Sequence, residues 1–327
     1  MDCWSTSISH ADETSVPVVK GRFAPSPTGR MHLGNVYAAL MSMLSAKSRG
    51  GKWLLRIEDL DPGRSRYEYA RQIEDDLHRL GLEWDEGGLD DRGDAGPYSQ
   101  SRREAFYVSA LERLSRLGLV YPCTCRRADL LASQAPHQSD GCVVYSGRCR
   151  PATLPDNNIV LPGNVAIRLA VPDRYISFDD EIRLKQEVNL ARDCGDFIVR
   201  RSDGCFAYQL AVVVDDELMG VTEVVRGDDL LLSTARQIYL QELLGYRRLS
   251  YCHLPLICNS DGQRLSKRDR SMALDSLFER HSPREIIGIV ASMAGLIDKP
   301  EPCSPTELIP LYDPIKIRNK SLFHNKY

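Results

Sequence analysis

The stretch Arg22-Phe-Ala-Pro-Ser-Pro-Thr-Gly-Arg-Met-His-Leu-Gly-Asn35 decides the fold of this chain. Its two prolines keep residues 24–29 out of a helix, because each proline restricts its own backbone and that of the preceding residue. The apolar segment Val18–Phe23 predicts a strand before this loop, and the small and apolar residues of His32–Ser48 predict a helix after it. A second strand is predicted at Trp53–Ile57. This order predicts a strand, loop, helix and strand unit of an α/β protein.

The loop and the start of the helix suit phosphate binding. Gly34 lies beside polar groups at a helix N-terminus, where backbone amides can approach phosphates and the helix dipole favours anions. His32 and Asn35 are three residues apart, so both side chains are expected on one helix face and can contact one nucleotide. The alternative is a proline-rich turn before a capped helix.

A second candidate site is the basic segment Arg264-Leu-Ser-Lys-Arg268, which follows a turn predicted at Asp261-Gly262. A lysine on a flexible loop can close over a triphosphate and neutralise the charge that develops during displacement at phosphorus. The alternative is a solvated basic surface, which is the commoner role of such runs.

Together the two segments resemble the paired nucleotide-binding signatures of class I aminoacyl-tRNA synthetases. His32–Asn35 is similar to the His-Ile-Gly-His motif. Arg264–Arg268 is similar to the Lys-Met-Ser-Lys-Ser loop, although arginine replaces its first and last residues. The resemblance is to the glutamyl branch, from about residue 21 to 297. The other segments that match this branch, in order, are Arg22–Gly29, Arg56–Asp61, Tyr208, Ala211–Asp216 and Arg226–Asp229.

This resemblance implies roles for the matched residues. The ATP-binding residues would be His32, Gly34, Asn35, Arg264, Ser266 and Lys267. Of these, His32, Asn35 and Lys267 would be catalytic, by positioning and charge stabilisation, and Mg²⁺ would accompany the ATP.

Glutamate carries two carboxylates and one ammonium group, so its pocket needs fixed cations and an anion. The resemblance implies that Arg22 and Arg226 meet carboxylate and that Glu58 meets the ammonium group. Ser26 and Tyr208 would complete the contacts. A structural ion pair between Glu58 and an arginine is the alternative. Residues 24–29 read Ala-Pro-Ser-Pro-Thr-Gly, whereas glutaminyl enzymes tend to read Pro-Pro-Glu-Pro-Asn-Gly, so glutamate is favoured over glutamine.

The irregular region between Pro122 and Pro162 is predicted to hold one structural Zn²⁺. Three thiolates and one further ligand form a closed tetrahedral site, which stabilises a region with little apolar core. The resemblance implies Tyr145 as the further ligand and Cys142 competes for that place; reduced surface thiols are the alternative. The predicted ligands are Cys123, Cys125, Tyr145 and Cys149.

The predicted fold class is α/β, with a Rossmann-type parallel sheet, an inserted α+β zinc-binding subdomain and a short C-terminal helical region. Residues 1–20 are expected to form a flexible tail, 21–117 and 196–245 the two halves of the catalytic domain, and 118–195 the inserted acceptor-binding and zinc-binding subdomain. Residues 246–327 would hold the signature loop and the C-terminal helices.

Further elements are predicted along the chain. Helices are predicted at Tyr67–Leu80, Arg102–Leu117 and Asp229–Leu244, and from a capping box at Ser282–Glu285 to Met293. Residues 81–96 are predicted to form a surface loop, and residues 165–169 and 196–200 strands. Residues 206–214 suit either a buried strand or a short buried helix.

The composition limits the expected partners. The net charge of −3 gives no general basic surface for nucleic acid, so an RNA partner must be argued from local sites. No apolar run approaches the roughly 20 residues of a membrane span, so no membrane partner is expected. Without a secretory signal, the ten cysteines are expected to be reduced thiols or metal ligands in the cytoplasm. A monomer is expected.

The chain ends too soon after Arg268 for an anticodon-binding domain, which typically needs about 100 residues or more. Such a short chain resembles the glutamyl-queuosine tRNA(Asp) synthetases. This resemblance implies activation of L-glutamate by ATP and its transfer to queuosine in the anticodon loop of tRNA(Asp). The alternatives are a shortened glutamyl-tRNA synthetase that charges the 3′ end of tRNA(Glu), and a non-catalytic protein that senses glutamate or ATP.

Overall fold

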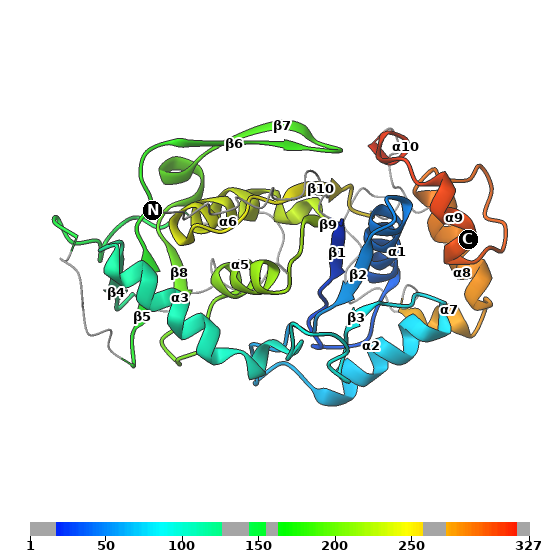
Figure 1. Cartoon of the computed structure of the whole chain (residues 1–327), viewed down its shortest axis with the longest axis horizontal. Helices are drawn as coiled ribbons and strands as arrows, with labels where there is room; N and C mark the ends of the chain where they lie inside the picture. Colours follow the sequence, from blue (N-terminus) through cyan, green and yellow to red (C-terminus); the bar gives the residue numbers. More distant parts are fainter. Residues whose placement is uncertain (1–17, 126–143, 155–162, 258–272, 319–327) are drawn as a thin grey trace, which may run out of the picture.

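The computed structural model describes residues 18–125, 144–154, 163–257 and 273–318. The molecule is elongated, with parallel strands in its middle, antiparallel strands at one end and the C-terminal helices at the other (Figure 1). Of the predicted site residues, Arg264, Ser266, Lys267 and the competing ligand Cys142 lie outside the described residues.

The first parallel sheet has the order β1-β2-β3. Strands β1 (Lys20–Phe23) and β2 (Lys52–Leu55) are joined by helix α1 (Leu33–Ser48), which confirms the predicted strand, loop, helix and strand unit. The third strand, β3 (Glu86–Gly87), corrects the prediction of a surface loop at residues 81–96. Glu86 and Gly87 are buried, and Gly87, which adopts a φ of 94°, approaches the backbone of β2 closely.

The second sheet has the order β7-β6-β10-β9. Strand β10 (Ser250–Leu254) pairs in parallel with β9 (Glu223–Gly227) and with the end of β6 (Tyr175–Asp180), and β7 (Leu184–Asn189) completes an antiparallel hairpin with β6. Thr222 N donates to Lys20 O (2.9 Å), which joins this sheet to β1. The hairpin and β9 were not predicted from the sequence.

The third sheet is antiparallel, in the order β4-β5-β8. Its strands are β4 (Val120–Cys123), β5 (Ala166–Leu169) and β8 (Phe197–Arg200). β5 and β8 confirm the two strands predicted there, and β4 was not predicted. The range 118–195 therefore contributes β4 and β5 to this sheet and the β6–β7 hairpin to the second one; the domain boundary itself stays a prediction.

Helices cover the sheets on both sides and agree largely with the predictions (Figure 1). Most of the segment predicted as either strand or helix, residues 208–214, belongs to the helix α5 (Tyr208–Leu218). The main helices are α2 (Tyr67–Arg79), α3 (Glu104–Arg116), α5 (Tyr208–Leu218), α6 (Leu231–Leu244), α7 (Leu274–Phe278), α8 (Pro283–Met293), α9 (Pro305–Leu308) and α10 (Pro314–Arg318). Shorter turns of 3-10 or π helix span Gln100–Arg102, Leu190–Cys194, Asp228–Leu230 and Ile309–Leu311. The predicted capping box of Ser282 and Glu285 is present at α8.

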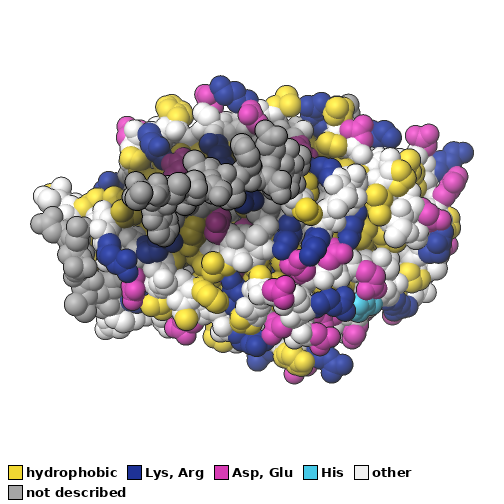
Figure 2. All heavy atoms as spheres, in the orientation of Figure 1, with side chains coloured by type: hydrophobic (Ala, Val, Ile, Leu, Met, Phe, Trp, Pro, Cys, Tyr) yellow, Lys and Arg dark blue, Asp and Glu magenta, His cyan; other side chains and the backbone are white. Residues whose placement is uncertain are grey.

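Two large apolar clusters hold these layers together. One surrounds α1 and includes residues of α2 and the C-terminal helices, and the other lies among α3, α5, α6 and the β6–β7 hairpin. Acidic and basic side chains are interspersed on the face shown in Figure 2, in keeping with the small net charge. None of the described helices is both long and apolar enough to cross a lipid bilayer.

Candidate active site

One pocket lies where the first and second sheets meet, at the carboxyl ends of the parallel strands β1, β9 and β10 and beside the start of α1. Ligands of open α/β sheets typically bind at this edge of the strands. The predicted site residues that line the pocket are Arg22, Ser26, His32, Gly34, Asn35, Glu58, Tyr208 and Arg226. The structure therefore brings every described member of the predicted glutamate and ATP sites to one cavity.

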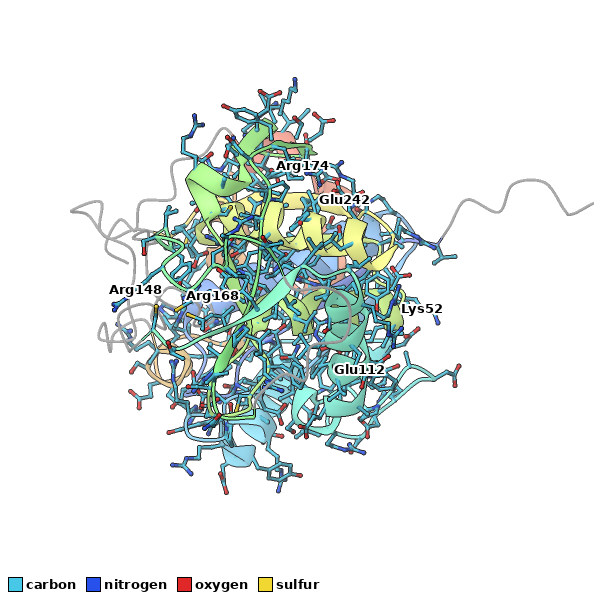
Figure 3. All side chains as sticks on the ribbon, turned by 90° about the vertical axis from the view of Figure 1, so that its left-hand side faces the viewer. Lys52, Glu112, Arg148, Arg168, Arg174 and Glu242 are labelled. Carbon is cyan, nitrogen blue, oxygen red and sulfur yellow. The ribbon has the colours of Figure 1, made fainter. Side chains whose placement is uncertain are left out.

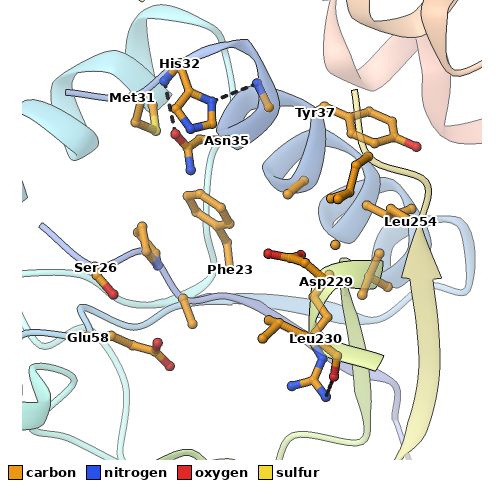
Figure 4. Close-up of a pocket in the computed structure, with 18 of the residues that line it drawn as sticks. Phe23, Ser26, Met31, His32, Asn35, Tyr37, Glu58, Asp229, Leu230 and Leu254 are labelled. Carbon is orange, nitrogen blue, oxygen red and sulfur yellow. Dashed lines mark hydrogen bonds between the residues drawn. The ribbon is translucent and has the colours of Figure 1, made fainter. Parts of the chain in front are cut away.

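The pocket has two ends (Figure 4). His32 and Asn35 lie at one end, Ser26 and Glu58 at the other, and the Phe23 ring lies between them. The separation suits a ligand with two parts. The first end is formed by a helix N-terminus, which favours anions, and the second contains a buried carboxylate.

The His32 and Asn35 side chains both turn back onto the start of α1. Gly34 N donates to His32 Nδ1 (3.1 Å), and His32 N donates to Asn35 Oδ1 (3.0 Å), so the two residues form a capping box. The sequence predicted one shared helix face; His32 is instead the residue that caps the helix. The cap fixes the position of both side chains at the pocket wall.

Buried charges support the opposite end of the pocket. Arg56 is fully buried and donates to Asp216 Oδ1 (2.6 Å) and Glu58 Oε1 (3.2 Å). Arg22 Nε lies 3.4 Å from the same Asp216 oxygen. Burial raises the pKa of Glu58 to about 7, although Arg56 and Arg22 act in the opposite direction. The ion pair expected as the alternative role of Glu58 is thus present, and Glu58 still reaches the pocket.

Arg226 lies at the end of β9 and is held from several sides. Its Nε donates to His253 Nε2 (3.1 Å), its Nη1 to Gln237 Oε1 (2.8 Å), and its Nη2 to Thr234 Oγ1 (2.7 Å). Tyr208, at the start of α5, is buried nearby, and this burial raises the pKa of its hydroxyl. The arginine side chain therefore has a fixed place in the pocket wall.

The sequence reasoning gave no role to Asp216 or His253. Asp216 belongs to a matched segment, but its contacts with Arg22 and Arg56 join residues far apart in the chain. His253 is fully buried in β10. The signal for it in the sequence was a histidine beside the apolar residues of this strand. Neither role follows from local spacing.

Of the two described flanks of the second signature segment, one lines the pocket and the other contacts residues that line it. Ile257, which precedes that segment, lines the cavity, and Ala273, which follows it, forms an isolated β-bridge with His32. Leu274 N also donates to Met31 O (3.1 Å).

A second candidate site lies at the end of the molecule formed by the antiparallel sheet. The sulfur atoms of Cys123, Cys125 and Cys149 lie within 4.8 Å of one another. The Tyr145 hydroxyl lies 3.5 Å from Cys123 Sγ and 3.4 Å from Cys125 Sγ. Three thiols and a phenol oxygen form a donor set that fits a four-coordinate metal ion. All four predicted ligands are thus brought together.

Arg168 packs against this cluster. Its guanidinium lies 3.6 Å from the centre of the Tyr145 ring, and its Nε donates to Cys123 Sγ (3.2 Å). Figure 3 views the molecule from this end, where Arg168 and Arg148 lie on the same side. Arg168, on β5, thus contacts both a thiol and the aromatic ring of the predicted ligand set.

Comparison with known proteins agrees with this arrangement. The family model described as tRNA synthetases class I (E and Q), catalytic domain, matches residues 18–296. A protein of Symbiobacterium thermophilum named glutamyl-Q tRNA(Asp) synthetase is 47% identical, over 91% of this chain and 93% of that protein. A protein of the same name from Nitratidesulfovibrio vulgaris is 46% identical, over 90% of this chain and 92% of that protein.

Among solved structures, a glutamate tRNA ligase of Elizabethkingia meningosepticum in complex with its amino acid is 29% identical, with a TM-score of 0.74. The match covers 93% of this chain and 66% of that ligase. A glutamate-tRNA synthetase of Elizabethkingia anophelis is also 29% identical, with a TM-score of 0.76. The parallel sheet, the capped helix at the pocket and these similarities lead to one conclusion: the chain belongs to the class I tRNA synthetases of the E and Q type.

Proposed function

We propose that this protein activates L-glutamate with ATP and transfers the glutamyl group to the queuosine base of tRNA(Asp). The observation that carries the proposal is one pocket that joins a capped helix N-terminus to two buried arginines, Arg22 and Arg226, and one buried glutamate, Glu58. The acceptor is supported by the name shared by the relatives that are 46–47% identical over about nine tenths of the chain.

The amino acid would occupy the charged end of the pocket. Arg22 and Arg226 would bind carboxylate groups, and Glu58 would bind the ammonium group as a carboxylate. Ser26 and Tyr208 also line this cavity and would complete the contacts. Two cations and one anion match the charges of glutamate, whereas glutamine would leave one arginine without a carboxylate.

ATP would bind at the other end, against the start of α1. Its proposed contacts are His32, Gly34 and Asn35, together with Arg264, Ser266 and Lys267 of the second signature segment, and Mg²⁺ would neutralise part of the phosphate charge. An oxygen of the glutamate α-carboxylate attacks the α-phosphorus, and the bond from this phosphorus to the bridging oxygen of the β-phosphate breaks. The products are glutamyl-adenylate and pyrophosphate.

The cysteine cluster would hold one structural Zn²⁺, bound by Cys123, Cys125, Cys149 and Tyr145. The ion would fix the loop after β4 against the antiparallel sheet, where the apolar cluster is small. Such a site would support the subdomain proposed at residues 118–195 and its contact with tRNA. We place the enzyme in the cytoplasm, as a monomer, with its tRNA partner.

A second candidate function is the charging of tRNA(Glu), favoured by the similarity to glutamate tRNA ligases. The test is transfer of labelled glutamate, with ATP, to three RNAs: tRNA(Asp) with queuosine, tRNA(Asp) without it, and tRNA(Glu). Labelling of the queuosine form alone is expected, and labelling of tRNA(Glu) alone would replace the proposal with the second function. If the protein labels none of the three RNAs and does not exchange ATP with pyrophosphate, it is a non-catalytic binder.

A further inference from the structure

Among the described residues, every hydrogen-bond acceptor that Arg226 reaches is neutral. The acceptors are His253 Nε2 (3.1 Å), Gln237 Oε1 (2.8 Å), Thr234 Oγ1 (2.7 Å) and, more distantly, Leu230 O (3.4 Å). Arg226 is only 5% exposed, so water contributes little to its solvation. Four neutral acceptors therefore fix the guanidinium without neutralising its charge.

The other two arginines at this end of the pocket have a different environment. Arg22 and Arg56 share the Asp216 carboxylate, and Arg56 also contacts Glu58. A buried arginine normally needs a carboxylate partner, because an uncompensated buried charge is costly. Among the described residues, no carboxylate contacts Arg226, and Asp216 acts on it only through its charge at longer range, so Arg226 can take an anionic group in the pocket as its contact partner.

His253 can serve as an acceptor in only one protonation state. Asp180 Oδ2 lies 2.6 Å from His253 Nδ1, and a carboxylate can only accept, so Nδ1 carries the proton. Arg226 Nε can only donate, so His253 Nε2 carries a lone pair. Burial lowers the pKa of His253 to about 4, although Asp180 acts in the opposite direction, which agrees with a neutral ring.

Asp180 is itself held firmly at the end of β6. Its Oδ1 accepts from Ile182 N (3.0 Å) and Arg183 N (2.7 Å), and both of its oxygens accept from His253 N. Burial alone would raise the pKa of Asp180, but these hydrogen bonds hold it below its usual value. The Asp180 carboxylate thus stays charged, and the His253 ring lies between it and Arg226.

We propose that Asp180 and His253 are positioning residues of the amino-acid pocket, which hold Arg226 in place and leave its charge free for the substrate carboxylate. Asp180 fixes the ring orientation and tautomer of His253, and His253 in turn presents a neutral acceptor to Arg226. The β6–β7 hairpin, which supplies Asp180, thereby becomes part of the substrate site. This inference rests on the proposed function, in which Arg226 binds glutamate.

Gln237→Glu is the sharpest test, because it keeps the size of the side chain and places a carboxylate on Arg226. We expect this change to raise the KM for glutamate by about tenfold or more, since a charged hydrogen bond to the substrate is lost to an internal partner. The KM for ATP should stay within about twofold, because the nucleotide lies at the other end of the pocket. The measurement is ATP–pyrophosphate exchange with glutamate or ATP varied.

His253 and Asp180 are tested by pairs of variants. His253→Leu removes the acceptor and should raise the KM for glutamate, whereas His253→Gln can offer a carboxamide oxygen to Arg226 and should restore part of the affinity. Asp180→Asn should raise the same KM more modestly. The matched controls are Cys252→Ala, the buried neighbour on β10, and Asp179→Asn, the exposed neighbour on β6; both should leave the KM for glutamate unchanged.

The outcomes separate this inference from the proposed function. Absence of glutamate-dependent exchange in the unmodified protein would overturn both. Normal exchange with an unchanged KM for glutamate in Gln237→Glu and His253→Leu would overturn the inference alone. A lower kcat with unchanged KM values for glutamate and ATP would assign His253 and Asp180 a structural role only. This outcome also overturns the inference. Direct titration with glutamate checks the KM values as binding constants.

Discussion

Asp216 Oδ1 lies 2.6 Å from Arg56 Nη1, deep beneath the pocket, and this contact joins residues 160 positions apart in the chain. Both side chains are almost completely inaccessible to solvent. Arg22 contacts the same carboxylate, so one acidic group bridges two buried cations. Burial alone would raise the pKa of Asp216, but the two arginines hold it below its usual value.

Asp216→Ala should therefore destabilise the protein strongly. Removal of one partner from a buried ion pair typically costs about 3–5 kcal/mol, because the remaining charge is left without compensation. The free energy of unfolding in urea is the measurement. Asp203→Ala is the control: Asp203 pairs with Arg201 near the surface, and loss of such a pair costs about 1 kcal/mol or less. Equal effects of the two changes would contradict this account.

The sequence predicted the β1, α1 and β2 unit because its signals are local. A proline-rich loop, a capped helix and two apolar strands lie next to one another in the chain. Strand β9 was missed because Glu223 and Arg226 interrupt its apolar residues, yet both are buried in the fold. Asp180, the last residue of β6, is buried as well. The charged residues at the end of this strand are therefore no sign of a turn on the surface.

The same difference between local signals and tertiary contacts decides which residues of the candidate site could be predicted. Residues within short signatures, such as His32 and Asn35, were placed at the pocket from their spacing and from the family resemblance. Asp216 and His253 were not, because their roles depend on contacts between segments that only the tertiary fold brings together. The position of Arg226 was predicted, but not the neutral acceptors around it.

Glu58 should make glutamate binding dependent on pH. Burial raises its pKa to about 7, and only the carboxylate form can bind an ammonium group. As the pH falls through about 7, the Glu58 carboxylate becomes protonated, so kcat/KM for glutamate should fall. Above about pH 8 the group is ionised, and kcat/KM should stay constant. Exchange rates measured at limiting glutamate and saturating ATP provide the profile.

Glu58→Gln is the matching variant. Its kcat/KM for glutamate should be low and should not show the transition near pH 7, because the titrating group is absent. A wild-type profile that is flat between about pH 6 and 8, or a variant that keeps the same transition, would show that Glu58 does not meet the ammonium group.

The thiol cluster should bind one zinc ion per chain. Cys125→Ser should remove the ion and destabilise the antiparallel end of the molecule. The apolar cluster there is small, and without the ion it would lose the metal–ligand bonds that hold its segments together. Elemental analysis of the purified protein measures the zinc, and thermal unfolding measures the stability. Cys303→Ser is the control, since Cys303 is partly buried outside this cluster. Equal zinc contents in the two variants would remove the metal site from the proposal.

Gly87 should be intolerant of a side chain. Its φ of 94° disfavours other residues, and a Cβ atom would lie only 1.9 Å from Leu55 O of the neighbouring strand. Gly204 has a nearly identical φ of 91°, but a Cβ atom added there would have no neighbouring atom within 4 Å, so it separates backbone strain from the clash. Gly204→Ala should cost about 1 kcal/mol from the backbone alone.

Gly87→Ala should cost clearly more than Gly204→Ala, about 3 kcal/mol or above, because the backbone of β3 must also move away from β2. Free energies of unfolding of the two variants, measured in urea under the same conditions, give the difference directly. Because Arg56 and Glu58 follow β2 in the chain, displacement of that strand should also weaken glutamate binding in Gly87→Ala and not in Gly204→Ala. Equal stability of the two variants would mean that β3 adapts without cost, and that the close contact with Leu55 does not hold this edge of the sheet.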